Sequence, residues 1–135
     1  MREIKKIIVH CSATKEGQNF NAKDITRWHL ERGFKTIGYH YVVTLDGTIQ
    51  VGRKETSIGA HCSGHNKDSI GVCYIGGLDK NGKPKDTRTK EQKESLLELL
   101  TTLKRKYPKA IICNHYDYAN KACPSFNARD EYKDI

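Results

Sequence analysis

The first third of the chain predicts a strand followed by an amphipathic helix. Residues 4–10 are β-branched and apolar enough for a strand. The two-residue period of a strand places the side chains of His10 and Cys11 on opposite faces. After a polar loop, a helix is expected near 22–32, because Asn21 is a good N-cap and a glycine follows the last helical residue.

The middle of the chain predicts a β-hairpin and a buried strand. Residues 39–44 and 48–51 flank the dipeptide Asp46-Gly47, which supplies the positive φ of a tight turn. Residues 69–75 predict a buried strand. Loops are expected over 52–68 and 76–88.

The last third predicts a long helix, a short strand and a loop-rich tail. Thr89 and Gln92 form a capping box, and the leucines that follow mark one wide helical stripe: Leu96, Leu97, Leu99, Leu100 and Leu103. A strand is expected over 110–113 and a brief helix after Pro124-Ser125. This order of elements predicts an α/β fold, a central mixed β-sheet flanked by helices, in a single domain over residues 1–135.

Composition agrees with one compact domain and adds a strong positive charge. A chain of 135 residues that is 36% hydrophobic can bury one core and is too short for two ordinary domains. The net charge of +8 favours polyanionic partners, among them nucleic acid, anionic lipid and an acidic wall polymer. Charge alone does not choose among these partners.

Cysteine count and the N-terminus indicate a reduced protein without a targeting segment. Five cysteines without regular spacing favour free thiols over a disulfide framework. The apolar run Ile7-Ile8-Val9 is too short for a signal peptide or a membrane span. We therefore expect a cytoplasmic product as synthesised, which would reach an extracellular substrate only after lysis, through a pore or by a separate export route.

Three potential zinc ligands lie near the two ends of the chain. They are His10 at the end of the first predicted strand, and His115 and Cys123 in the tail. Two imidazoles and one thiolate leave one tetrahedral position for water, which is typical of a catalytic zinc site. The sequence therefore predicts a hydrolase with one zinc ion.

Several segments, in the same order over nearly the whole chain, carry a family resemblance. They are Val9-His10-Cys11-Ser12-Ala13-Thr14, Gly38-Tyr39-His40-Tyr41, Asp46-Gly47-Thr48 with Gly52-Arg53, Gly59-Ala60-His61, Asn66 with Ser69-Ile70-Gly71-Val72, and His115 with Lys121-Ala122-Cys123-Pro124-Ser125-Phe126. The chain resembles the type 2, zinc-dependent N-acetylmuramoyl-L-alanine amidases, the family of short phage lysozymes and animal peptidoglycan-recognition proteins. The phage branch is the more similar of the two.

The resemblance implies a role for each matching residue. It implies that His10, His115 and Cys123 bind zinc and that Tyr39 and Lys121 flank the water at the open position. His61 is expected in the substrate groove. The implied substrate is the peptidoglycan amide between the lactyl group of N-acetylmuramic acid and the L-alanine of the stem peptide. Apart from the resemblance, a monomer is expected.

The residue types themselves suit amide hydrolysis. Lys121 lies two residues before Cys123, so in an extended segment both side chains point the same way. Its ammonium can stabilise an oxyanion or give a proton to the departing amine, and the hydroxyl of Tyr39 can bind the same oxyanion. No carboxylate pair suited to glycosidic cleavage is evident.

Other histidines and one acidic residue have weaker signals. His40 alternates away from Tyr39 and is expected to be buried and hydrogen-bonded, whereas His29 and His65 are expected to be solvated. Asp117 either orients a ligand imidazole or caps a turn. The remaining cysteines are expected to be small buried residues: Cys11, Cys62, Cys73 and Cys113.

Two alternative functions remain at this level. The first is a peptidoglycan-binding module without activity, against which the presence of both Cys123 and Tyr39 argues. The second is a basic nucleic-acid-binding or polymerase-binding protein, suggested only by charge, because no basic motif interleaved with aromatic residues accompanies it.

Overall fold

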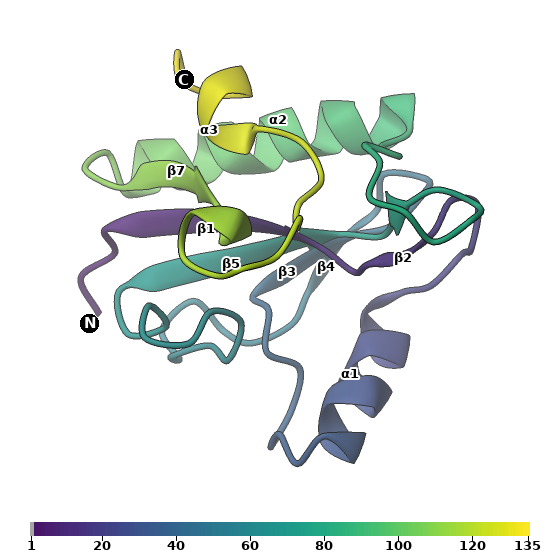
Figure 1. The fold of residues 1–135 in the computed structure, drawn as a ribbon. Coiled ribbons are helices and arrows are strands. Elements are labelled where there is room, and N and C mark those ends of the chain that lie inside the picture. Colours follow the sequence, from purple (N-terminus) through teal and green to yellow (C-terminus); the bar gives the residue numbers. More distant parts are fainter. Residues whose placement is uncertain (1) are drawn as a thin grey trace.

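The computed structural model describes residues 2–135 and contains a central five-stranded sheet (Figure 1). The strand order is β4-β3-β5-β1-β7, formed by β1 (Lys6–Cys11), β3 (Tyr41–Val43), β4 (Ile49–Val51), β5 (Ser69–Tyr74) and β7 (Ile111–Asn114). The hairpin of β3 and β4 is antiparallel, and the other three pairs in this sheet are parallel. The sheet is therefore mixed, as predicted, and it forms one domain.

A second, small sheet lies where the sequence predicted only loop. β2 (Thr14–Lys15) pairs in parallel with β6 (Gly77–Leu78), so the prediction of a loop throughout 76–88 was wrong. The pair Gly76-Gly77 indicated a loop in the sequence, and in the structure it adopts positive φ values of 132° and 100°. The amide of Gly77 donates to Thr87 Oγ1, a contact between distant residues that a local pattern does not contain.

Helices cover both faces of the central sheet (Figure 1). α2 (Lys90–Lys106) and the short α3 (Ala128–Glu131) lie on one face, and α1 (Ala22–Glu31) lies on the other. A 3-10 turn, η1 (His115–Asp117), follows β7 directly. Within residues 2–135, no helix has the length and apolar character needed to cross a bilayer.

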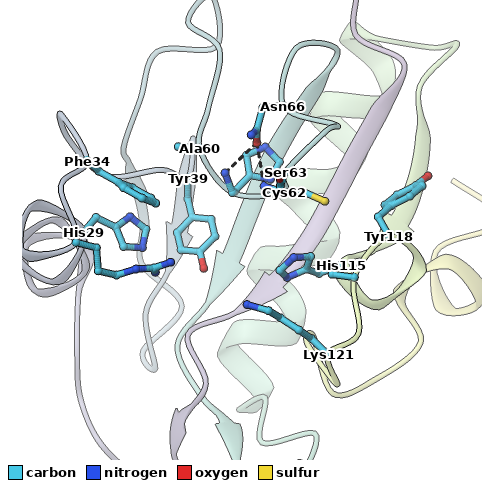
Figure 2. A pocket seen from close by; sticks show the side chains of 13 residues that line it. His29, Phe34, Tyr39, Ala60, Cys62, Ser63, Asn66, His115, Tyr118 and Lys121 are labelled. Carbon is cyan, nitrogen blue, oxygen red and sulfur yellow. Dashed lines mark hydrogen bonds between the residues drawn. The ribbon is translucent and has the colours of Figure 1, made fainter.

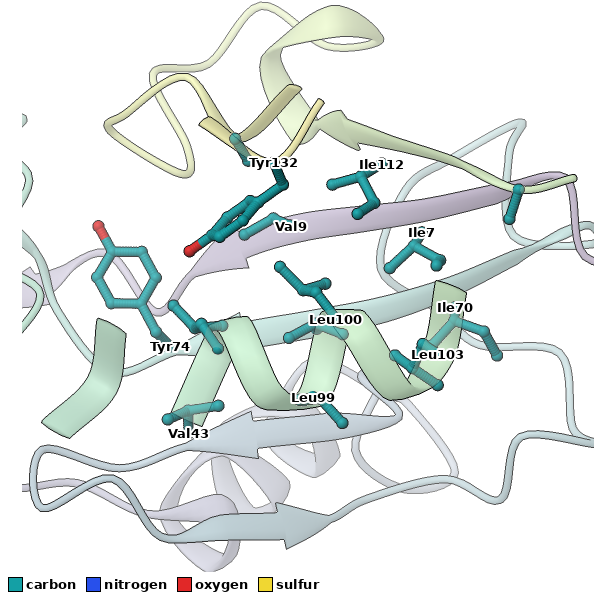
Figure 3. Packing of buried hydrophobic residues seen from close by; sticks show 14 of the residues in the cluster. Ile7, Val9, Val43, Ile70, Tyr74, Leu99, Leu100, Leu103, Ile112 and Tyr132 are labelled. Atoms are coloured by element: carbon teal, nitrogen blue, oxygen red, sulfur yellow. The ribbon is translucent and has the colours of Figure 1, made fainter. Parts of the chain in front are cut away.

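The main core lies between α2 and the sheet (Figure 3). Leucines of α2 pack against the strand residues Ile7, Val9 and Ile70: Leu96, Leu99, Leu100 and Leu103. Leu97 is 48% exposed, so the stripe is narrower than predicted. The predicted N-cap at Asn21 and the predicted capping box at Thr89 are confirmed, and Asn21 also forms a capping box, with Asp24.

A buried arginine fastens the C-terminal segment to the loop before α2. The Arg88 guanidinium donates to both carboxylate oxygens of Glu131, at 2.7 and 2.8 Å, and to both oxygens of Asp86, at 2.9 Å each. It also donates to the hydroxyl of Tyr132 and lies over the ring of Phe126, with Cζ 3.5 Å from the centroid. These contacts connect α3 to the loop before α2, next to the tail that carries two of the three candidate metal ligands, His115 and Cys123.

Arg88→Met is expected to lower the free energy of unfolding by about 2–3 kcal/mol, because two carboxylates then lose their common partner. Arg27→Met is a matched control, since its ion pair with Asp24 is exposed and such pairs contribute roughly 0.5 kcal/mol or less. Urea denaturation followed by circular dichroism measures both changes. Equal losses in the free energy of unfolding from the two substitutions would show that the Arg88 contacts do not stabilise the fold.

Candidate metal centre

Strand register brings His10 and His115 together. β1 and β7 are parallel, and the Cα of Val9 is the partner of Asn114. The next residues along each strand direction are His10 and His115, so the two imidazoles meet at the carboxyl ends of these strands. Their Nδ1 atoms are 3.1 Å apart.

Cys123 completes the cluster from the C-terminal tail. The backbone amide of Cys11 donates to Cys123 Sγ at 3.1 Å, and the amide of Tyr116 donates to the carbonyl of Cys123 at 2.9 Å. The three donor atoms of His10, His115 and Cys123 all lie within 4.8 Å of one another. A tetrahedral zinc ion separates such donors by about 3.2–3.7 Å. The donor set and its spacing therefore fit zinc.

Protonation of the cluster follows from burial and from neighbouring groups. Burial, followed by the nearby His61 and His115, lowers the pKa of His10 well below its usual value. Burial and the charge of Lys121 lower the pKa of His115. The adjacent side chain of Cys11, together with burial, raises the pKa of the Cys123 thiol. The imidazoles are therefore neutral at neutral pH, and a cation must displace the proton of Cys123.

A pocket of about 370 Å³ opens beside the cluster (Figure 2). Tyr39 lines it from one side, and Lys121 lines it from the side of His115. The ring of Tyr39 lies 5.0 Å from that of His10, centroid to centroid. Burial raises the pKa of Tyr39 well above its usual value, so its hydroxyl remains a hydrogen-bond donor.

The other residues singled out in the sequence have defined places. His61 lines the pocket, and it also contacts His10, which the sequence did not predict. Its expected place in a substrate groove stays a prediction. His40 is buried and its Nδ1 accepts from the amide of Gly71, which confirms the expected structural role. Asp117 accepts from the amide of Asn114 and so caps the turn η1.

His29 was wrongly expected to be solvated. It is buried on α1, its Nδ1 accepts from the amide of Gly38 at 2.8 Å, and burial with the charge of Arg32 lowers its pKa to about 4. Its spacing of four residues from the buried Ile25 was the available signal. Several other residues that line the pocket had no local signal: Arg32, Phe34, Ser63 and Tyr118.

Fold and site together define an α/β enzyme with a candidate metal centre at the carboxyl edge of its sheet. A family model described as "N-acetylmuramoyl-L-alanine amidase" matches residues 1–126. The chain belongs to this amidase family, of type 2, and its enzymatic class is N-acetylmuramoyl-L-alanine amidase.

Relatives in sequence and structure agree with this assignment. The endolysins of Enterobacteria phage T3 and Escherichia phage T7 are each 46% identical over 123 residues, which is 91% of this chain and 82% of theirs. The amidase LysC from Clostridium intestinale superposes with a TM-score of 0.82 at 29% identity, covering 96% of this chain and 82% of LysC. Drosophila PGRP-LB shares the fold, with a TM-score of 0.81 at 24% identity over 99% of this chain and 82% of its own.

Proposed function

We propose that the chain uses one zinc ion, held by His10, His115 and Cys123, to hydrolyse the amide between the lactyl group of N-acetylmuramic acid and the L-alanine of the stem peptide. One observation carries the proposal: these three donor atoms, from opposite ends of the chain, lie within 4.8 Å of one another. The donor set leaves a fourth tetrahedral position open, as in catalytic zinc sites. The catalytic domain is proposed to span residues 1–135.

The amide bond is unreactive toward water, and the site has to supply both a nucleophile and stabilisation of the oxyanion. When bound, zinc lowers the pKa of a water ligand to about 7 and polarises a carbonyl oxygen. His10 and His115 provide neutral lone pairs at neutral pH because burial lowers their pKa values. Cys123 provides a thiolate after loss of its proton.

Tyr39 and Lys121 are proposed to act on the substrate from two sides of the pocket. The Tyr39 hydroxyl donates a hydrogen bond to the developing oxyanion, and the Lys121 ammonium stabilises the same charge or protonates the departing amine. Both residues line the pocket that contains His115.

Peptidoglycan is the proposed partner, and the pocket offers groups suited to a sugar–peptide segment. Aromatic rings of Phe34 and Tyr118 offer apolar faces, while Arg32 and Asn66 offer hydrogen-bond donors. The similarity to phage endolysins supports action on the cell wall after lysis or export by another route. We propose that the protein acts there as a monomer.

Mass spectrometry of products from defined muropeptides tests the bond that is cut. The zinc-loaded protein is expected to release free stem peptide and an intact sugar, and treatment with a chelator is expected to stop this release. Cleaved glycan with the peptide still attached would refute amide hydrolysis. Undiminished release of stem peptide after complete removal of metal would refute the role of zinc.

Zinc affinity is expected to rise with pH. The pKa values of His10 and His115 are lowered and that of Cys123 is raised, so near neutral pH one proton leaves for each ion bound. The dissociation constant should therefore fall about tenfold per pH unit between roughly pH 6 and 8. Competition with a chromophoric chelator at three pH values measures the slope. A flat profile would show that Cys123 does not lose a proton on binding.

A further inference from the structure

His61 makes the closest contact to a candidate metal ligand from outside the cluster. Its Nδ1 lies 2.8 Å from Nε2 of His10, and the two rings meet edge to face at 89° with centroids 4.9 Å apart. The side chain is 8% exposed, so most of the ring is enclosed by protein.

The contacts of His10 fix the direction of this hydrogen bond. Nδ1 of His10 is the atom that faces His115, at 3.1 Å, so it is the nitrogen placed to bind a cation. Nε2 of His10 then carries the ring proton and donates to Nδ1 of His61. Nε2 of His61 is then protonated and donates a hydrogen bond to the buried hydroxyl of Ser69, at 3.1 Å.

The surrounding backbone is shaped around the His61 ring. A Cβ added at Gly59 or at Gly71 would lie within 2.7 or 2.6 Å of ring atoms of His61, so both positions need glycine. The side chain of Asn66 accepts from the amides of His61 and Cys62, at 2.9 Å each, and fixes the loop at this point. The space for the His61 ring is therefore left by glycines in two segments, Gly59 in the loop 52–68 and Gly71 in β5.

We infer that His61 is a positioning residue, which holds His10 in the tautomer and orientation that a zinc ion requires. This inference rests on the proposed zinc site and assigns His61 a task apart from contact with substrate. Metal-bound imidazoles usually donate their second N–H to a carboxylate, a carbonyl or water. Here the acceptor is a second neutral imidazole, anchored in turn by Ser69, so His10 is oriented without adding negative charge to the site.

Zinc affinity of the purified protein, measured by chelator competition, tests the inference. His61→Ala is expected to weaken zinc binding about 10–100-fold, whereas His61→Asn, whose Oδ1 can replace Nδ1 as acceptor, should restore most of the affinity. His65→Ala is the matched control in the same loop, because His65 stacks on Tyr118 and does not touch the ligands; it should leave affinity unchanged. At saturating zinc, His61→Ala should show little change in KM.

Two outcomes would overturn the inference. Wild-type affinity in His61→Ala together with a raised KM would make His61 a substrate-binding residue only, and the proposed function would survive. Failure of the wild-type chain to bind zinc would overturn the proposed function as well. A measurement on the unaltered chain avoids any folding defect: long-range ¹H–¹⁵N spectra should show His61 protonated at Nε2, and protonation at Nδ1 would refute the assignment.

Discussion

Cys123→Ser is expected to reduce amide hydrolysis by about 10³-fold or more, and to reduce zinc content well below one ion per chain. The serine hydroxyl has nearly the shape of the thiol, so the backbone contacts of Cys123 can persist. A hydroxyl does not give up its proton as readily as a thiol and is a poor zinc ligand beside two imidazoles. Elemental analysis and stem-peptide release from muropeptides measure the two effects on the same preparation.

Cys113→Ser is the matched control for this substitution. Cys113 is buried, whereas Cys123 is partly exposed, and it lies away from the cluster. It packs against Ile8 and Cys62 and accepts a hydrogen bond from Tyr118. A serine there should cost stability and leave zinc content at the wild-type level. Loss of zinc in Cys113→Ser with full retention in Cys123→Ser would contradict the proposed ligand set.

Tyr39→Phe and Lys121→Met are each expected to lower kcat by about 10²-fold, with zinc content unchanged. Each substitution removes one group placed to stabilise the developing oxyanion, and neither removes a metal donor. Burial raises the pKa of Tyr39, so its hydroxyl stays protonated in the wild-type protein and can donate. The phenylalanine substitution removes this donor. Single-turnover kinetics at saturating substrate separates this effect from weaker binding.

The kinetics of Tyr39→Phe and Lys121→Met test whether the two residues act in the transition state, which zinc content alone does not test. A rise in KM with unchanged kcat would assign Tyr39 and Lys121 to substrate binding instead of to the transition state. Unchanged kinetics in both variants would refute their proposed roles. Loss of zinc in Tyr39→Phe would show that the tyrosine supports the metal centre.

Local patterns in the sequence predicted most of the secondary structure. The capping residues Asn21 and Thr89 satisfy backbone amides within a few residues, so their effect is visible in a short window of sequence. The turn at Asp46-Gly47 depends on one positive φ and was predicted for the same reason. The predicted ends of most helices and strands differ from the observed ends by one or two residues, because the last helical turns and strand pairs depend on tertiary contacts.

The candidate metal ligands were predicted from their chemistry and from the family resemblance. That they lie close together became visible only in the folded structure. His10 and His115 meet because β1 and β7 are neighbours in register, although the two residues are 105 positions apart. No local pattern encodes such a pairing. The contact of His61 with His10 was missed for the same reason, since it depends on how a loop packs onto the sheet. The burial of His29 did have a local signal, its helical spacing from Ile25, which the prediction overlooked.

Zinc K-edge X-ray absorption spectroscopy of the purified wild-type protein tests the central claim most directly. The account predicts one ion per chain with one sulfur at about 2.3 Å, two imidazole nitrogens at about 2.0–2.1 Å and one further light atom. These would be the donors of Cys123, His10 and His115. A zinc shell without sulfur, or a protein that takes up no zinc, would contradict it.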